Sequence, residues 1–169
     1  MFDQPQPKPQ HANAWPLVWT FIQKPPSDSR KKARCVTNGY KCWRWTVQLG
    51  QTYTNSLATD SERLFWAIAA KWCLLVVGAD VSSAFAKAPA PEDTFYIVPD
   101  CIFHSWWVNH KQQQPIPTGW VLKVEYALQG HPESPHLWDK DITYILNEKI
   151  GYQLLHHEQC LYVATLYGH

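Results

Sequence analysis

The chain of 169 residues lacks several features that would assign it to a familiar class of protein. Its 15 Lys and Arg residues are balanced by 14 Asp and Glu residues, so net charge gives no indication of nucleic-acid binding, and such a contact would need a local basic patch. No apolar run approaches the roughly 18 residues of a membrane span, and the polar, proline-rich residues 1–10 do not form a secretory signal. The sequence therefore predicts neither a membrane protein nor a secreted one.

Cysteine pairs and the common catalytic signatures are also absent. The 5 cysteines lie far apart without a CxxC pair, so we expect no disulfide framework and an intracellular, reducing location. No GxSxG, Walker or HExxH motif occurs, which leaves hydrolase and P-loop functions without support. His156, His157 and Glu158 are adjacent, but no further ligand follows at a spacing typical of a metal site.

What the chain does have is a composition that favours a folded core. Hydrophobic residues make up 46% of it and charged residues 17%, and its 10 tryptophans ordinarily act as anchors of a core. Residues 1–14 are polar and rich in proline, so we expect a disordered leader there. A single folded domain is expected over residues 15–169.

The hydrophobic pattern predicts the α+β class, with a mixed antiparallel sheet packed by helices. Strands at residues 15–23 and 32–37, separated by a turn at residues 25–29, should form a hairpin. A helix should begin at Thr59, whose side chain would form a capping box with Glu62. Further strands are expected at residues 74–77, 95–98, 120–124 and 160–166, and further helical segments at residues 59–72, 82–88, 101–111 and 134–151.

Asp80 is the first residue with a pattern suited to chemistry. It follows the apolar run Leu74–Val77, which reads as a buried strand, and a carboxylate at a strand end is held rigidly enough to ligate Mg²⁺. The alternative, favoured by composition alone, is an N-cap for a helical turn that starts at Ser82. Phe85 would lie about one helical turn beyond the carboxylate, either walling a pocket or packing in the core.

Two further groups of residues are candidates for binding. Lys32 and Arg34 are two positions apart, so on a strand they share a face and could hold a triphosphate; they could equally protect a solvated edge strand. Gln129 and Gly130 precede a helix that starts at Ser134 as its cap, and a glycine there lets the backbone approach a ligand closely. The alternative for this pair is an ordinary connecting turn.

Taken in order, these segments resemble one family, the copia-type retrotransposon reverse transcriptases. Residues 32–39 (KARCVTNG) resemble the family's KARLVAKG segment, and residues 80–85 (DVSSAF) resemble its DVKTAF motif A. Residues 95–97 (FYI) stand where the family has its EEIYM strand. Residues 121–138, which include ALQGHPESPHLW, are similar to LNKALYGLKQAPRAW, and residues 159–162 (QCLY) are similar to the DPCLY strand that leads into motif C. The resemblance extends over about residues 15–166.

The resemblance implies an RNA-directed DNA polymerase that adds deoxynucleotides to a primer on an RNA or DNA template, with two Mg²⁺ ions. It implies that Asp80 ligates both ions and that Phe85 is a steric gate against a ribose 2′-hydroxyl. Gln129 and Gly130 would line the nucleotide pocket, and Lys32 and Arg34 would hold the triphosphate. The fold implied is the fingers and front part of the palm.

The chain departs from this pattern in one respect, since it contains no Asp-Asp pair of the kind that forms motif C. We therefore expect a domain truncated before motif C, inactive by itself unless a partner chain completes the palm. Without the motif C hairpin, the strand before Asp80 would leave an apolar edge exposed. Two alternatives remain: a non-catalytic nucleic-acid-binding remnant that uses the basic residues and aromatic stacking, and an aromatic-rich interaction module suggested by the tryptophans.

Overall fold

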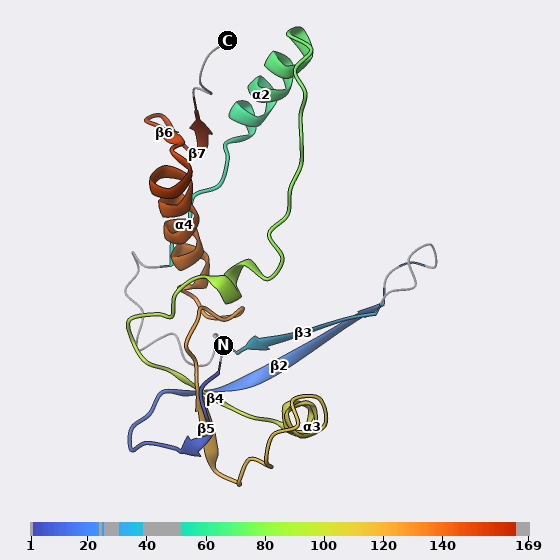
Figure 1. Cartoon of the computed structure of the whole chain (residues 1–169), viewed down its shortest axis with the longest axis vertical. Helices are drawn as coiled ribbons and strands as arrows, with labels where there is room; N and C mark the ends of the chain where they lie inside the picture. Colours follow the sequence, from blue (N-terminus) through green and yellow to red (C-terminus); the bar gives the residue numbers. More distant parts are fainter. Residues whose placement is uncertain (1, 24, 26–30, 39–51, 165–169) are drawn as a thin grey trace.

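The structure, a computed structural model, describes residues 2–23, 25, 31–38 and 52–164. Its helices and sheets are mixed along the chain, which confirms the α+β class (Figure 1). The strands are β1 (Gln6–Pro7), β2 (Ala14–Gln23), β3 (Lys31–Thr37), β4 (Tyr96–Val98), β5 (Trp120–Lys123), β6 (Gln153–Leu155) and β7 (Glu158–Val163). The helical segments are α2 (Thr59–Lys71), the 3-10 helix η2 (Ala84–Lys87), α3 (Cys101–Asn109), α4 (Ser134–Tyr144) and the π-helical turn η3 (Ile145–Ile150).

Five strands form one sheet in the order β1-β5-β4-β2-β3, and β6 and β7 form a separate hairpin. The predicted pairing of the first long strands is confirmed, because β2 runs antiparallel to β3 with Leu17 opposite Thr37 and Gln23 opposite Lys31. This two-stranded β2–β3 ribbon projects from the body of the sheet (Figure 1). Of the turn expected at residues 25–29, only Pro25 lies within the described residues.

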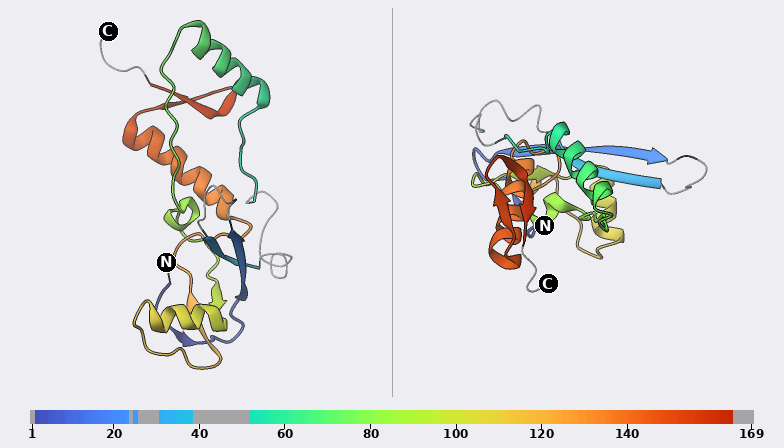
Figure 2. Two further views of the ribbon diagram at one scale, coloured as in Figure 1. Left: turned by 90° about the vertical axis from the view of Figure 1, so that its right-hand side faces the viewer. Right: turned by 90° about the horizontal axis from the view of Figure 1, so that it is seen from above.

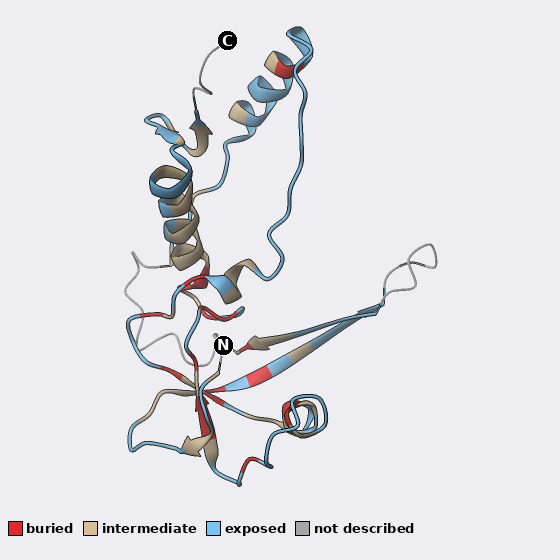
Figure 3. Ribbon diagram, in the orientation of Figure 1, coloured by how far each residue is buried: buried red, intermediate tan, exposed pale blue. Residues whose placement is uncertain are grey.

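The core lies where the sheet meets α3. Trp15, Ile97 and Leu122 are completely buried on neighbouring strands, and α3 covers them with Phe103 and Trp107 (Figure 3). This helix begins after Asp100, whose carboxylate accepts the Phe103 amide at 2.8 Å as an N-cap. The second Asp100 oxygen accepts the Trp19 indole N–H at 2.8 Å, so one side chain ties the start of α3 to β2.

Residues 2–14 differ from the expected disordered leader, since they are built into the sheet. Gln6 pairs with Val121 of β5, and the Asp3 amide donates to the Lys123 carbonyl at 3.1 Å. The Phe2 ring stands edge-on to Phe103 at 5.4 Å. Proline and polar side chains suggested disorder, but the open edge of β5 gives this segment backbone partners that composition does not reveal.

Helix α2 occupies the predicted position but not with the predicted cap. The N-cap is Ala58 rather than Thr59, and no side chain from within the helix caps it, so the Thr59–Glu62 capping box is wrong. Glu158 of β7 takes that place: its carboxylate accepts from the Ser61 hydroxyl at 2.7 Å and from the Ala58 amide at 3.4 Å. The hydrogen bond from Ser61 lowers the pKa of Glu158.

The largest correction concerns residues 74–77, which were expected to form a buried strand. The segment has no strand conformation, and Leu75 and Val77 are 90% and 79% exposed. A run of branched apolar residues predicts a strand only where another strand pairs with it, and none of the described residues does so. The helical segment expected at residues 82–88 is the shorter η2, and Trp72, one of the tryptophans expected to anchor a core, is 62% exposed.

The C-terminal elements follow the sequence closely. Helix α4 starts at Ser134, although Glu133 rather than Ser134 is its N-cap, and the helical run ends through η3 at Gly151 in the left-handed conformation (φ +85°). Figure 2 shows α2, α4 and the β6–β7 hairpin at one end of the molecule and the sheet with α3 at the other. Within the described residues, no helix combines the length and the apolarity needed to cross a membrane.

Candidate functional site

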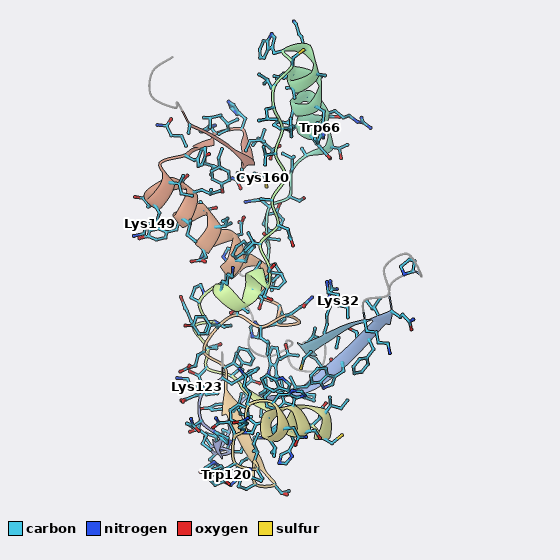
Figure 4. All side chains as sticks on the ribbon, turned by 45° about the vertical axis from the view of Figure 1, so that its right-hand side comes forward. Lys32, Trp66, Trp120, Lys123, Lys149 and Cys160 are labelled. Atoms are coloured by element: carbon cyan, nitrogen blue, oxygen red, sulfur yellow. The ribbon has the colours of Figure 1, made fainter. Side chains whose placement is uncertain are left out.

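The basic residues of the β2–β3 ribbon share one face, as strand alternation predicts. Lys32 stands opposite Ile22 and Arg34 opposite Thr20, so both cations rise from the same side of the ribbon. Both side chains are exposed, and Figure 4 shows Lys32 on this projecting element. The ribbon therefore presents two cations to solvent about two residue steps, or roughly 7 Å, apart.

The other end of β3 is locked to the Gln129–Gly130 turn. The Thr37 amide donates to the Gln129 carbonyl at 2.9 Å, and the Thr37 hydroxyl donates to the same oxygen at 3.3 Å. Thr37 is buried, whereas the Gln129 side chain is exposed beside it. The structure thus brings together two of the predicted site segments, which are far apart in sequence.

Gly130 is required by this contact. Its φ of +94° is a left-handed conformation, and a Cβ atom placed there would collide with the Thr37 carbonyl and lie 2.9 Å from the Thr37 nitrogen. Gly130 therefore allows a close backbone approach, but among the described residues its partner is the backbone of β3, and the expected approach to a ligand stays a prediction.

His131 is a residue that sequence reasoning missed. Its ring stacks on Trp15 (centroids 4.6 Å apart, planes at 10°) and packs on Phe95 (4.6 Å, 31°). The Glu133 amide donates to Nδ1 at 3.2 Å, which places the imidazole proton on Nε2. Burial lowers the pKa of His131 to about 4, so the ring is neutral in the folded protein. No local pattern marks such a histidine, because the two rings that enclose it come from parts of the chain that are distant in sequence.

The segment that carries Phe85 is also joined to the Gln129–Gly130 turn. Phe85 lies half-buried in η2, which packs against α4. Directly after η2, the Ala88 carbonyl accepts the Ala127 amide at 3.1 Å, two residues before Gln129. The Phe85 segment, the turn and the basic ribbon are therefore connected through backbone hydrogen bonds.

Asp80 is not brought into this arrangement. It is exposed in the irregular segment between α2 and η2, and no hydrogen bond or ion pair to it occurs among the described residues. The alternative assignment as an N-cap is wrong, because Ser83 is the N-cap of η2 and no side chain caps that helix. Its role as a metal ligand stays a prediction, and the strand that was expected to hold it is absent.

A groove lined by described residues lies elsewhere. It has a volume of about 410 Å³ and runs along α4 and η3 beside the β6–β7 hairpin. None of the predicted site residues lines it; its walls are formed by Asn55, Asp139, Lys140, Thr143, Tyr144, Asn147, Glu148, Leu154 and Gln159. The candidate site is therefore an exposed surface and not this groove.

Replacing Gly130 with Ala should separate the turn from β3. The new Cβ meets rigid backbone and also adopts an unfavourable φ, so we expect a loss of about 3 kcal/mol or more in the free energy of unfolding, measured by urea denaturation. Gly119→Ala is the matched control: its φ is +81°, but no atom lies within 4 Å of the added Cβ, so only about 1 kcal/mol should be lost. Equal losses in the free energy of unfolding for the two variants would contradict a tight contact between Gly130 and the backbone of β3.

The buried imidazole makes stability depend on pH in a defined direction. An unfolded chain titrates near 6.5 and the folded His131 near 4, so the unfolded state takes up the proton first as the pH falls. Above pH 6.5 the contribution of His131 to the free energy of unfolding is at its full value. Between pH 6.5 and pH 4 this contribution falls by about 3 kcal/mol, and below pH 4 it does not change further.

His131→Phe should keep the stacking and lose this dependence. Other groups, such as Glu133 with its raised pKa, act equally in both proteins and cancel in the comparison. Urea unfolding of the two proteins from pH 7.5 to pH 4 measures the difference, and parallel stability curves would show that His131 is not held neutral.

The family assignment rests on a comparison of the whole chain with known proteins. The family described as reverse transcriptase (RNA-dependent DNA polymerase) matches residues 5–168. Comparisons with curated proteins and with solved structures give no significant match. Because the family match includes the β2–β3 ribbon, Phe85 and the Gln129–Gly130 turn, this chain belongs to the reverse transcriptase (RNA-dependent DNA polymerase) family.

Proposed function

We propose that the chain forms the nucleotide-facing part of a copia-type retrotransposon reverse transcriptase, acting on deoxynucleoside triphosphates and a primed RNA or DNA template. Members of this family bind nucleic-acid templates and deoxynucleotides. The observation that carries the proposal is the lock between Thr37 and Gln129, because it fixes the basic ribbon relative to the turn that carries the second set of predicted contacts.

Lys32 and Arg34 suit the triphosphate by charge and spacing. Two cations on one strand face can reach neighbouring phosphate groups, and a guanidinium can donate two hydrogen bonds to one of them. The β3 strand is anchored close to these cations, because Thr37, three residues beyond Arg34, is hydrogen-bonded to the Gln129 carbonyl.

Phe85 is proposed as the gate that excludes a ribose. A ring rejects the extra hydroxyl by bulk, which suits a task in which binding contacts alone discriminate poorly. Its half-buried position on η2, backed by α4, gives the ring a support against displacement.

The metal requirement is met only in part by this chain. Polymerases of this family use Mg²⁺, and we propose Asp80 as one ligand by its match to motif A. However, no group of three or more His, Cys, Asp and Glu side chains is arranged to hold a metal ion in the part of the chain that the structure describes. One exposed carboxylate cannot by itself hold a pair of metal ions.

A second candidate function is nucleic-acid binding without catalysis. On the ribbon face opposite Lys32 and Arg34, the rings of Trp19 and Phe21 stack with centroids 6.2 Å apart and planes at 9°. Phe21 is 67% exposed, so this face offers an aromatic surface on which an unpaired base could stack. The tryptophans otherwise give less support to an interaction module, because Trp15 and Trp107 are buried in the core.

The second function predicts that the basic ribbon binds nucleic acid directly. We expect Lys32→Ala with Arg34→Ala to lower the affinity for a fluorescein-labelled DNA primer annealed to an RNA template by about tenfold or more at low salt. The slope of log affinity against log salt should also fall by about 1 to 2, because two phosphate contacts are lost. Fluorescence anisotropy over a series of salt concentrations measures both effects.

The matched control removes the same charge elsewhere. Lys111 and Lys149 are exposed lysines outside the ribbon, and their joint replacement by Ala should change the affinity little. Equal weakening by the two double variants would mean that net charge, and not the ribbon, governs binding.

Primer extension tests whether this chain has polymerase activity by itself. We expect this chain alone to incorporate no deoxynucleotide in the presence of Mg²⁺, because it carries no Asp-Asp pair and losing such groups lowers rates by orders of magnitude. Template-dependent synthesis that disappears in the Asp80→Asn variant would overturn this expectation and would establish Asp80 as catalytic.

A further inference from the structure

The loop of the β6–β7 hairpin (Figure 1) consists of two adjacent histidines. Leu155 pairs with Glu158, so His156 and His157 alone connect the two strands. Two-residue hairpin loops favour glycine, asparagine and aspartate, because the usual turns need positive φ angles. Neither histidine has a positive φ. Turn chemistry therefore does not account for a histidine at both positions.

The turn brings the two imidazole rings together. On a strand, adjacent side chains point to opposite faces, so two neighbouring histidines could not meet there. In this loop, Nδ1 of His156 lies 3.5 Å from Nδ1 of His157, and the ring centroids are 4.8 Å apart with planes at 75°. Within the described part of the chain, neither ring makes another hydrogen bond. Both side chains are exposed, so their nitrogens can be reached from solvent.

The distance between the two nitrogens is close to that of two nitrogens bound to one metal ion. Imidazole nitrogens bind Zn²⁺ at about 2.0–2.1 Å, so two of them in a tetrahedral site lie about 3.4 Å apart. In a neutral ring whose proton is on Nε2, Nδ1 carries the free lone pair that a metal needs. The alternative is a hydrogen bond between the rings, in which one Nδ1 donates to the other.

The charge around the loop favours a cation. Residues 150–169 contain one carboxylate side chain, that of Glu158, and neither Lys nor Arg. The Glu158 carboxylate accepts from the Ser61 hydroxyl and the Ala58 amide, so it would attract a cation by its charge without being a ligand. Among the described residues, no third His, Cys, Asp or Glu completes a metal-binding group with the two rings. Water would therefore fill the remaining coordination positions.

We propose that His156 and His157 form a two-histidine site for a divalent transition-metal ion such as Zn²⁺, bound through both Nδ1 atoms. Imidazole ligands suit zinc, copper and nickel, whereas Mg²⁺ prefers oxygen ligands. A bound ion would also restrict the turn that leads directly into Glu158, the residue that caps α2. The site does not depend on the polymerase assignment.

Modification by diethylpyrocarbonate, mapped for each histidine by mass spectrometry, tests the site in the natural chain. The reagent acylates a free imidazole nitrogen. With zinc in excess over the five cysteines, the modification of His156 and His157 should slow by about tenfold or more, because the metal occupies Nδ1 and Nε2 carries the proton. Exposed His110 should react at an unchanged rate, and Mg²⁺ should protect none of the three.

Single variants test whether the two rings bind one ion together. In His157→Gln zinc should no longer protect His156, and in His156→Gln it should no longer protect His157, because one imidazole binds much more weakly than two held together. His110→Gln is the matched control and should leave both residues protected. The loop is exposed, so the variants should fold, and far-ultraviolet circular dichroism checks this.

Three results would each overturn the proposal. They are the absence of protection by zinc in the natural chain, equal protection of His110, and protection of one loop histidine that survives replacement of the other.

Discussion

The contact between Thr37 and the Gln129 carbonyl is the constraint on which the candidate site depends. It joins residues 92 positions apart in sequence, and it does so with a backbone amide and a hydroxyl on one oxygen. Gly130 permits the contact because it carries no side chain where the β3 backbone passes. This junction ties β3 directly to the Gln129–Gly130 turn, while β2 is joined to the rest of the sheet by pairing with β4.

Aromatic packing also stabilises this contact between β3 and the Gln129–Gly130 turn. Trp15 is wholly buried at the start of β2. His131, which follows Gly130 directly, stacks on the Trp15 ring. Phe95 closes the other side of the imidazole. A neutral, enclosed ring in this position has few alternative arrangements, so the turn is held by packing as well as by hydrogen bonds.

Local patterns predicted those parts of the fold that local interactions decide. The β2–β3 hairpin, α3, α4 and the end of the last helix at Gly151 follow from strand alternation, helical spacing and a glycine stop. The basic pair on the ribbon follows for the same reason, since alternation alone places Lys32 and Arg34 on one face. The family resemblance is confirmed at the level of the reverse transcriptase family by the match over residues 5–168, while the grouping of these segments into one site stays a prediction.

The misassigned features all depend on partners distant in sequence. Residues 2–14 contact the sheet because β5 has a free edge, and His131 is buried because Trp15 of β2 and Phe95, just before β4, supply rings around it. Leu74–Val77 has the composition of a buried strand but no strand beside it among the described residues. Single-sequence patterns describe what a segment can do, and the neighbours decide which of those possibilities is realised.

Glu158 has a consequence for the order in which the chain acquires its structure. Its carboxylate caps α2 from a position 100 residues beyond Ala58. A helix of 13 residues with little buried surface is marginal by itself, and its first turn has no cap from its own sequence. During synthesis α2 therefore emerges long before the residue that secures its first turn. Helix α2, which carries aromatic residues, therefore remains unstable until β7 has been translated and has folded back onto the helix.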